Sequence, residues 1–426
     1  MGSISYTTTQ VVESAEERQQ HPIAGTITIK STKEDHFQRS YLTSTVPSLQ
    51  TVLLLYQPRT RYSLTPKHPI PTISSSTDLL IQIQAIGLNP IDWKAPDYNF
   101  GIPHLPYISG RDFAGVVLSD PHSLSGAKST EREIKKGDVV LGIATDYRDV
   151  RKSAFQQYAV AHSYNICRLP HRITPGQGAS LGVAFVAAAV ALGVCFGADF
   201  SAVDGQRRGP DLLRMIRGLP EGSLPKDVEA ECLNGIREDE RPRPGEWIVV
   251  WGGSSTTSLY ILQLARICGL RVILVGDVRK HGSGLVNRGA DLLVDSHDPD
   301  RALEVIRGVT KDNLRFAVDT TSKETTVRLI GAFPDGGKAR RHLVGLAGTP
   351  KIAPEHVACH AVPIKLFHEI AEVGESLMEW LERLLVHGNV SAPGIEIVTG
   401  GLHAVNEALD QMRRGEISGK RLVVEI

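Results

Sequence analysis

The stretch WIVVWGGSSTT, residues 247–257, joins an apolar run to a glycine pair and four hydroxyl residues. An apolar strand that ends in glycines and leads into a helix is typical of a phosphate-binding turn, because the backbone can approach the anion closely and the helix N-terminus offers free N–H groups. The expected phosphate contacts are the residues of the turn: Gly252, Gly253, Ser254, Ser255, Thr256 and Thr257. Ser258 stands near the place of the third glycine of the usual fingerprint. The alternative is a helix start that is merely capped by Ser and Thr side chains.

Strands and helices alternate after this turn. Apolar runs at 271–275, 292–294, 316–318 and 342–346 follow a helical stretch at 259–267, and further helical stretches lie between them. This alternation predicts right-handed crossovers and a parallel sheet. The expected fold class is therefore α/β, with a doubly wound Rossmann domain that binds NAD(P). Leu346, where the last run ends, is expected to contact the cofactor as well.

The end of the second strand normally reads the ribose of the cofactor. An acidic residue there favours NAD, whereas a nearby cation favours the 2′-phosphate of NADP. The chain offers Asp277 and, directly after it, Arg279 and Lys280. We expect NADPH from the two cations, with NADH or a merely solvated basic loop as the alternatives.

The first half of the chain follows a different pattern. Short β-rich runs at 51–55, 79–86, 115–117 and 138–141 are separated by Gly and Pro and predict a compact β-rich unit. An Ala-rich stretch at 179–192 predicts a buried helix. Residues 199–245 are charged and rich in Gly and Pro, which indicates an insertion. Residues 1–46 are rich in Ser, Thr, Gln and Glu without a sustained period, so we expect a flexible extension.

Composition excludes several classes of protein. Lys plus Arg and Asp plus Glu each total 47 in 426 residues, which argues against a nucleic-acid partner. Apolar runs are too short for a membrane span, and residues 1–30 lack the pattern of a signal peptide. The five cysteines are far apart and odd in number, which favours reduced thiols and a cytoplasmic protein.

Four motifs in order resemble those of the zinc-free medium-chain dehydrogenases and reductases. They are GLNPIDWK at 87–94, GRDFAGVV at 110–117, KGDVVLG at 136–142 and AFQQY at 154–158. DNLRFAVD at 312–319 and the ending 415–424 are similar to those of fungal trans-acting enoyl reductases, which reduce enoyl-thioesters on the carrier protein of a polyketide synthase. The resemblance spans about residues 50–426.

This resemblance implies a GroES-like β-rich catalytic domain that is split in sequence. Its parts would be 47–185 and 350–426, with the Rossmann domain at 186–349 between them and the active site in the cleft. Zinc-dependent relatives carry Cys and His where this chain has Asn89 and Arg111. A catalytic zinc needs three protein ligands, so we expect no metal. His356, Cys359, His360 and His368 are close in sequence, but scattered histidines are the preferred interpretation.

The resemblance also implies direct hydride transfer from the nicotinamide. Lys94 is the first candidate for polarising the substrate, with a surface ion pair as its alternative role. Tyr158 is the second, as a donor or wall beside the nicotinamide, and its alternative is a structural tyrosine. Val186 stands where these reductases usually carry a Thr, which points to an altered pocket.

Three functions remain open. The leading one is an NADPH-dependent trans-acting enoyl reductase of secondary metabolism, with a carrier-bound polyketide as substrate and a polyketide synthase as partner. The second is a free-standing quinone or enone reductase that acts on a small molecule. The third is a redox-independent protein that uses the fold as a scaffold.

Overall fold

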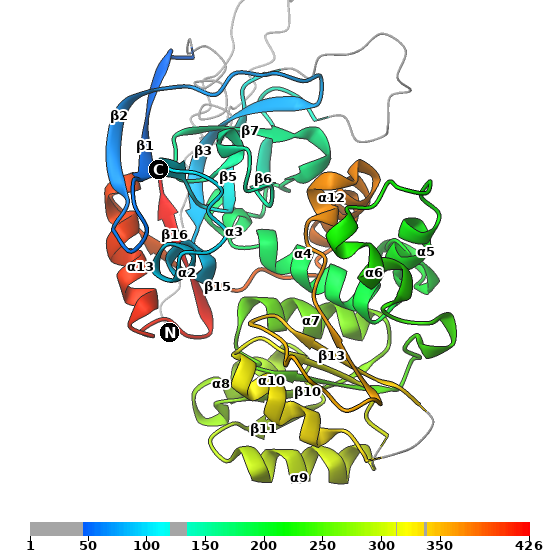
Figure 1. The fold of residues 1–426 in the computed structure, drawn as a ribbon. Helices are drawn as coiled ribbons and strands as arrows, with labels where there is room; N and C mark the ends of the chain where they lie inside the picture. The colour runs from blue at the N-terminus through cyan, green and yellow to red at the C-terminus, as the bar shows by residue number, and fades with distance from the viewer. Residues whose placement is uncertain (1–45, 120–133, 312, 336–338) are drawn as a thin grey trace, which may run out of the picture. The chain divides into compact units, whose positions relative to one another are not determined.

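The computed structural model describes residues 46–119, 134–311, 313–335 and 339–426 (Figure 1). Residues 1–45 of the expected flexible extension lie outside them. Of the part of the chain that is described, no helix combines the length and the apolar character that a bilayer crossing requires. Two large sheets organise this part, and we call the regions around them the nucleotide lobe and the β-rich lobe.

The nucleotide lobe contains a six-stranded parallel sheet in the order β11-β10-β9-β12-β13-β14. Its strands are β9 (Trp247–Trp251), β10 (Arg271–Gly276), β11 (Leu292–Asp295), β12 (Phe316–Asp319), β13 (Arg341–Gly345) and β14 (Val357–His360). Its helices are α7 (Thr256–Ile267), α8 (Val278–Asn287), α9 (Pro299–Thr310) and α10 (Lys323–Leu329). The parallel sheet expected from the sequence is therefore confirmed.

Successive side chains of β9 pack into two different apolar clusters, so the sheet is covered on both faces. Ile248 and Val250 belong to one apolar cluster, which also holds Leu262 of α7. Val249 belongs to another cluster, which also holds Ile306 of α9. Since successive side chains of a strand point to opposite faces, the two helices cover opposite sides of the same sheet.

The β-rich lobe is built on a seven-stranded sheet in the order β15-β16-β3-β5-β6-β8, with β7 paired to β3. A three-stranded sheet, β2-β1-β4, accompanies it. The strands are β1 (Leu49–Leu55), β2 (Ser63–Pro69), β3 (Asp78–Gly87), β4 (Tyr107–Ile108), β5 (Asp112–Val117), β6 (Val139–Ile143), β7 (Tyr158–His162), β8 (Ile166–Arg168), β15 (Gly394–Val398) and β16 (Lys420–Glu425). Because β16 pairs antiparallel with β3, residues 420–425 complete a sheet begun far earlier in the chain.

The remaining helices connect or flank the two sheets. They are α2 (Pro90–Tyr98), α3 (Pro175–Ala179), α4 (Gly182–Val190), α5 (Leu212–Arg217), α6 (Lys226–Asn234), α11 (Leu366–Glu369), α12 (Ala371–Val386) and α13 (Val405–Arg413). The single helix expected at 179–192 is instead α3, α4 and a π-helical turn at Ala191–Cys195, all within the apolar core. The charged stretch at 199–245 forms α5 and α6.

One expected boundary differs from the structure. The sequence placed the return to the β-rich lobe at residue 350. However, β14 pairs parallel with β13 from Arg341↔Val357 to Val344↔His360, so the parallel sheet continues to His360. The strand is only four residues long and contains Cys359 and His360, so no apolar run marked it in the sequence.

Candidate functional site

The glycine turn lies at the point where the strand order of the parallel sheet reverses. β9 is central, β10 and β11 follow on one side, and β12 to β14 follow on the other. Ligands of doubly wound sheets bind outside the carboxyl ends of the strands at such a point. Gly252 follows β9, and Thr320 follows β12 at the same edge. The predicted turn therefore occupies the position at which such sheets hold a nucleotide.

Gly252 satisfies two steric demands that another residue could not meet. Its φ angle is +85°, a conformation that L side chains rarely adopt. A Cβ atom at this position would come within 2.4 Å of Thr320 Oγ1 and 2.6 Å of Thr321 Oγ1. The absence of a side chain at Gly252 thus lets the turn pack directly against Thr320 and Thr321, which follow β12.

The hydroxyl residues of the turn divide into two groups. Ser255 caps α7, since its Oγ accepts a hydrogen bond from the Ser258 N–H at 3.1 Å, and it also donates to Thr320 Oγ1 at 3.0 Å. Among the described residues, Ser254, Thr256 and Thr257 make no side-chain hydrogen bond. The capping alternative therefore applies to Ser255, while the other three hydroxyls stay available at the helix N-terminus.

The expected ribose position lies where β10 leads into α8. Asp277 caps α8 by accepting a hydrogen bond from the Lys280 N–H at 2.9 Å. Arg279 and Lys280 are exposed, and neither side chain has a partner among the described residues. Asp295 and His297 lie close to Asp277, with His297 Nε2 3.9 Å from Asp277 Oδ2. At this position the Asp277 carboxylate is hydrogen-bonded to its own helix, whereas the side chains of Arg279 and Lys280 are unpaired among the described residues.

Leu346 follows β13 and lies at the same carboxyl edge. Its N–H donates to the Asp319 carbonyl at 2.8 Å, and its side chain is half-buried against the core. The edge thus brings together the residues predicted from three separate stretches: the glycine turn, the start of α8 and Leu346.

Asn89, Asp92, Arg111 and Asp112 meet between β3, β5 and α2, and we call this group the Asn89 corner. Asn89 Nδ2 donates to Asp112 Oδ2 at 3.0 Å, and Asp92 Oδ2 accepts from the Asn89 N–H at 2.8 Å. Asp112 Oδ1 also accepts from the Val183 N–H at 2.8 Å, at the start of α4. Asp112 is fully buried and forms an ion pair with Arg421 of β16. The corner therefore fixes the first helix to the sheet.

Arg111 is a buried cation without a carboxylate partner at salt-bridge distance among the described residues. It is 2% exposed, donates to Tyr107 Oη at 3.3 Å and stacks on the Tyr147 ring at 3.6 Å from the ring centroid. Asn89 and Arg111 are thus both engaged by protein groups at the positions where zinc-dependent relatives carry ligands.

Asp92 gives the corner a pH-dependent contribution to stability. Burial raises the pKa of Asp92 to about 7 from its usual 3.8, against the opposing effect of its hydrogen bond with the Asn89 N–H. The folded protein therefore holds this proton between about pH 4 and 7 while the unfolded chain releases it, so the contribution of Asp92 to stability declines as the pH rises through this window.

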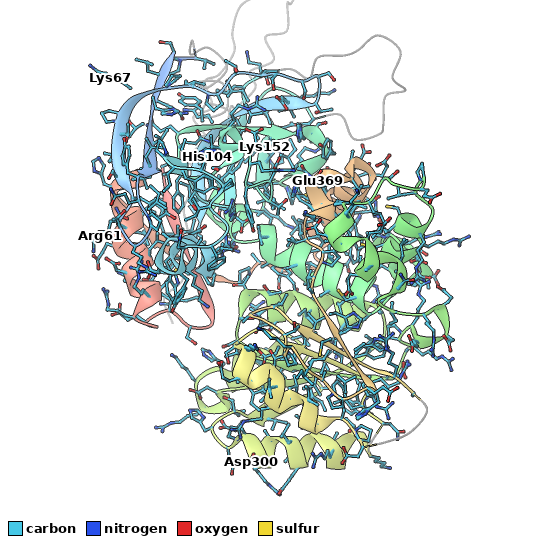
Figure 2. All side chains as sticks on the ribbon, viewed as in Figure 1. Arg61, Lys67, His104, Lys152, Asp300 and Glu369 are labelled. Carbon is cyan, nitrogen blue, oxygen red and sulfur yellow. The ribbon has the colours of Figure 1, made fainter. Side chains whose placement is uncertain are left out.

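We expect the Asp92→Asn variant to lack this decline. The difference in unfolding free energy between the wild type and the variant should shift by about 3–4 kcal/mol from pH 4 to pH 8, since the pKa of Asp92 is raised from 3.8 to about 7 and one pKa unit corresponds to about 1.4 kcal/mol. Urea unfolding of both proteins at a series of pH values measures this difference in unfolding free energy. Asp300→Asn, on an exposed carboxylate of α9 (Figure 2), is the control. A constant difference across the window would show that Asp92 is ionised throughout.

A pocket of about 520 Å³ lies beside the corner. Its walls come from the loop after α2, the loop after β6, the start of α6 and the segment between β14 and α11: Gly101, Ile102, Pro103, Thr145, Asp146, Tyr147, Arg148, Asp227, Val228, Val362, Pro363, Ile364, Lys365, His368 and Glu369. Tyr147, which stacks on Arg111, connects the pocket to the Asn89 corner. The segment after β14, which forms one wall of the pocket, leaves the parallel sheet at the same edge as Gly252.

The polar wall of the pocket is internally paired. Thr145 Oγ1 lies 2.8 Å from His368 Nδ1, and Arg148 Nη2 donates to Glu369 Oε1 at 2.7 Å. Burial lowers the pKa of His368 to about 4, so this imidazole is neutral near pH 7. Glu369 can be located in Figure 2. Ile102, Val228 and Val362 add apolar side chains to the lining of the pocket.

The structure separates the two predicted catalytic residues. Lys94 is half-buried on α2, with Nζ 5.6 Å from the centroid of the Trp93 ring, and the end of α2 leads into the pocket wall at Gly101. Tyr158 begins β7 opposite Gln82, which is five residues before Gly87 on β3 and hence roughly 16 Å along the strand from the corner. Neither Lys94 nor Tyr158 is among the residues that line the pocket. Val186 is fully buried within α4.

Sequence reasoning missed Thr320, Tyr147 and Thr145. Thr320 is 65 positions from Ser255, and the only signal was its place directly after an apolar run. The histidines that are close in sequence do not form one cluster: His368 contacts Thr145, whereas His360 contacts His342 and Glu231.

Comparisons with known proteins agree with this geometry. Residues 75–187 match the alcohol dehydrogenase GroES-like domain. The chain is 26% identical over 386 residues to a trans-enoyl reductase of Botryotinia fuckeliana, covering 85% of this chain and 96% of that protein. It is 26% identical over 404 residues to a trans-enoyl reductase of Aspergillus niger, covering 90% and 99%.

The fold is also that of solved structures. A quinone oxidoreductase of Escherichia coli, solved in complex with NADPH, superimposes with a TM-score of 0.61 at 14% identity and covers 88% of this chain and 100% of that one. The GroES-like domain, the Rossmann sheet and the similarity to medium-chain dehydrogenases and reductases are thus confirmed.

Proposed function

We propose that the protein is an NADPH-dependent enoyl reductase that acts on an α,β-unsaturated thioester carried by a polyketide synthase. The observation that carries the proposal is the glycine turn at the switch point of the sheet, in a chain similar to trans-enoyl reductases over most of its length. Ser254, Thr256 and Thr257 keep hydroxyls at the N-terminus of α7 that have no partner among the described residues, which suits a pyrophosphate. The five cysteines are free thiols, as is usual for proteins of the reducing cytoplasm.

In this proposal, some residues of the chain bind the cofactor and others act on the substrate. NADPH, when bound, would supply a hydride to the β-carbon of the enoyl group, and the α-carbon would take up a proton from water. Ser254, Thr256 and Thr257, with the N-terminus of α7, hold the pyrophosphate, and Arg279 and Lys280 hold the 2′-phosphate. Lys94 stabilises the negative charge that develops on the thioester oxygen. The pocket between the loop after α2 and the segment after β14 receives the acyl chain.

A quinone or enone reductase is the second candidate, because the fold is also that of quinone oxidoreductases. Titration with NADPH and NADH, followed by turnover of a model enoyl-thioester, separates the candidates. NADPH binding with thioester reduction supports the proposal. Binding with reduction of a quinone alone favours the second candidate, and binding of neither nucleotide would leave only a redox-independent scaffold.

The preference for NADPH should depend on the two exposed cations at the start of α8. We expect the double variant Arg279→Ala/Lys280→Ala to raise the Kd for NADPH by about tenfold, or about 1.4 kcal/mol. The Kd for NADH, which lacks the 2′-phosphate, should stay unchanged. Arg301→Ala on α9 is the control for a lost exposed cation. An equal effect on both nucleotides would contradict the assignment.

Lys94 should affect turnover more than nucleotide binding. We expect Lys94→Ala to lower kcat on the enoyl-thioester by about 100-fold, because the loss of one donor to a developing oxyanion costs about 100- to 1000-fold. The Kd for NADPH should change less than twofold. Lys67→Ala, on the exposed strand β2 (Figure 2), is the control. Unchanged turnover would remove Lys94 from the site.

A further inference from the structure

Three potential metal ligands meet where the insertion contacts the last strand of the parallel sheet. Cys195 ends the π-helical turn, Glu231 lies on α6, and His360 ends β14. One ligand atom of each lies within 4.8 Å of the others. Cys195 and His360 are 0% and 1% exposed, and the Glu231 side chain is 18% exposed. A thiolate, an imidazole and a carboxylate are the donor types that zinc prefers.

His360 belongs to a chain of three polar contacts in the core. Its Nδ1 lies 2.7 Å from Glu231 Oε1, and its Nε2 lies 3.0 Å from His342 Nδ1. His342 Nε2 in turn faces Glu240 Oε2 at 3.8 Å and has no hydrogen-bond partner among the described residues. His342 is completely buried.

Neutral imidazoles satisfy two of these contacts: the His360 Nδ1–H donates to Glu231 Oε1 and the His342 Nδ1–H donates to His360 Nε2. The third distance, 3.8 Å between His342 Nε2 and Glu240 Oε2, is too long for a hydrogen bond. Glu231 lacks a positive partner, since among the described residues no Lys or Arg lies within salt-bridge distance of it. A largely buried carboxylate of this kind is stabilised by a cation.

We propose that Cys195, Glu231 and His360 bind a divalent cation of the zinc class. The cation takes the place of the proton between Glu231 and His360, and Cys195 Sγ is its third ligand. The His360 Nε2–H then donates to His342 Nδ1, which is the usual way in which a metal-bound histidine is oriented. Three protein ligands leave one position for water.

This cation would join two walls of the pocket. Asp227 and Val228 line the pocket from α6, and Glu231 lies one helical turn beyond Asp227. Val362 to Lys365 line it directly after His360. Lys365 Nζ already pairs with Asp227 Oδ2 at 2.7 Å across the same junction. The cation therefore fixes the insertion to the segment after β14 and so sets the width of the pocket.

Cobalt provides a direct test on the full chain. The protein is stripped with a chelator and titrated with Co²⁺ while the near-ultraviolet absorption of a cobalt–thiolate bond is recorded. We expect a band that saturates at one equivalent and disappears on addition of Zn²⁺. The Cys195→Ser variant should lose the band. Cys359→Ser should keep it, because Cys359 precedes His360 on β14 but packs against the cluster on the opposite face of the sheet.

Two further variants cover the case in which Cys195→Ser does not fold. Glu231→Gln keeps the shape of the side chain and should lower the Co²⁺ affinity by about 10- to 100-fold, and His342→Gln should lower it by about tenfold, as expected for a residue that orients a ligand. The absence of a band in the wild type at one equivalent, or a band that persists in Cys195→Ser, would overturn the proposal. The contact between Glu231 and His360 would then be an ordinary hydrogen bond.

Discussion

We expect the Gly252→Val variant to bind NADPH about a thousandfold more weakly than the wild type, which corresponds to about 4 kcal/mol. Valine is strained at a φ of +85°, and its Cβ would lie 2.4 Å from Thr320 Oγ1. The turn must open to relieve this contact, which withdraws the N–H groups at the start of α7 from the pyrophosphate. Isothermal titration with NADPH measures the loss.

The control for this variant is Gly308→Val on α9, where a Cβ atom meets nothing within 4 Å. It should bind NADPH as the wild type does. Far-ultraviolet circular dichroism of Gly252→Val should retain the wild-type spectrum, because the strain is confined to one turn. Wild-type affinity in Gly252→Val would mean that the nucleotide binds elsewhere or not at all.

The Arg421→Met variant should lose about 3–5 kcal/mol of unfolding free energy, the usual cost of removing one partner of a buried ion pair. Removal of the Arg421 guanidinium leaves the Asp112 carboxylate without its cation. Neither Asp112 nor Arg421 is more than 4% exposed. The substitution also leaves acceptors without donors: Arg421 Nε donates to the Leu88 carbonyl at 3.1 Å and Nη1 to the Ser180 carbonyl at 3.0 Å. Equilibrium urea unfolding measures the change.

A double-variant cycle isolates the pair itself. Asp112→Asn keeps an oxygen for the Val183 N–H, so Asp112→Asn/Arg421→Met should be less destabilised than the sum of the two single variants. Arg301→Met is the matched control, because Arg301 pairs with Glu304 on the surface and both side chains are more than 60% exposed. A loss below about 1 kcal/mol in Arg421→Met would place the pair in the class of weak surface contacts.

The sequence predicted the strand, turn and helix around Gly252 because its signals there are local. The strand at 247–251, the glycine pair and the helix after it lie within some twenty residues, and backbone sterics alone relate them. The structure also joins Leu346 to this edge through a hydrogen bond with Asp319. The role of Thr320 was hidden, because its contact with Ser255 depends on how the sheet crosses over between β9 and β12.

The pocket could not be predicted in the same way. Gly101, Tyr147, Val228 and Lys365 come from four separate segments, and no periodicity links them. The neighbours of His360 could not be predicted for the same reason. His360 is close in sequence to His356 and His368, but the pairing of β14 with β13 brings it into contact with His342. Tyr158 was selected by its motif, but the register of β7 against β3 sets its distance from the corner.

Arg421 and Asp112 are 309 positions apart, and this separation governs how the protein is made. The six strands of the nucleotide lobe lie between Trp247 and His360, so a ribosome releases that sheet as one uninterrupted segment. The β-rich lobe begins earlier, and β3 can pair with β5 and β7 at once. However, the edge of β3 at residues 85–87 stays unpaired, and Asp112 lacks its cation, until β16 emerges. During synthesis the domain that starts second can therefore finish first, and the exposed edge of β3 is the surface on which a chaperone would act.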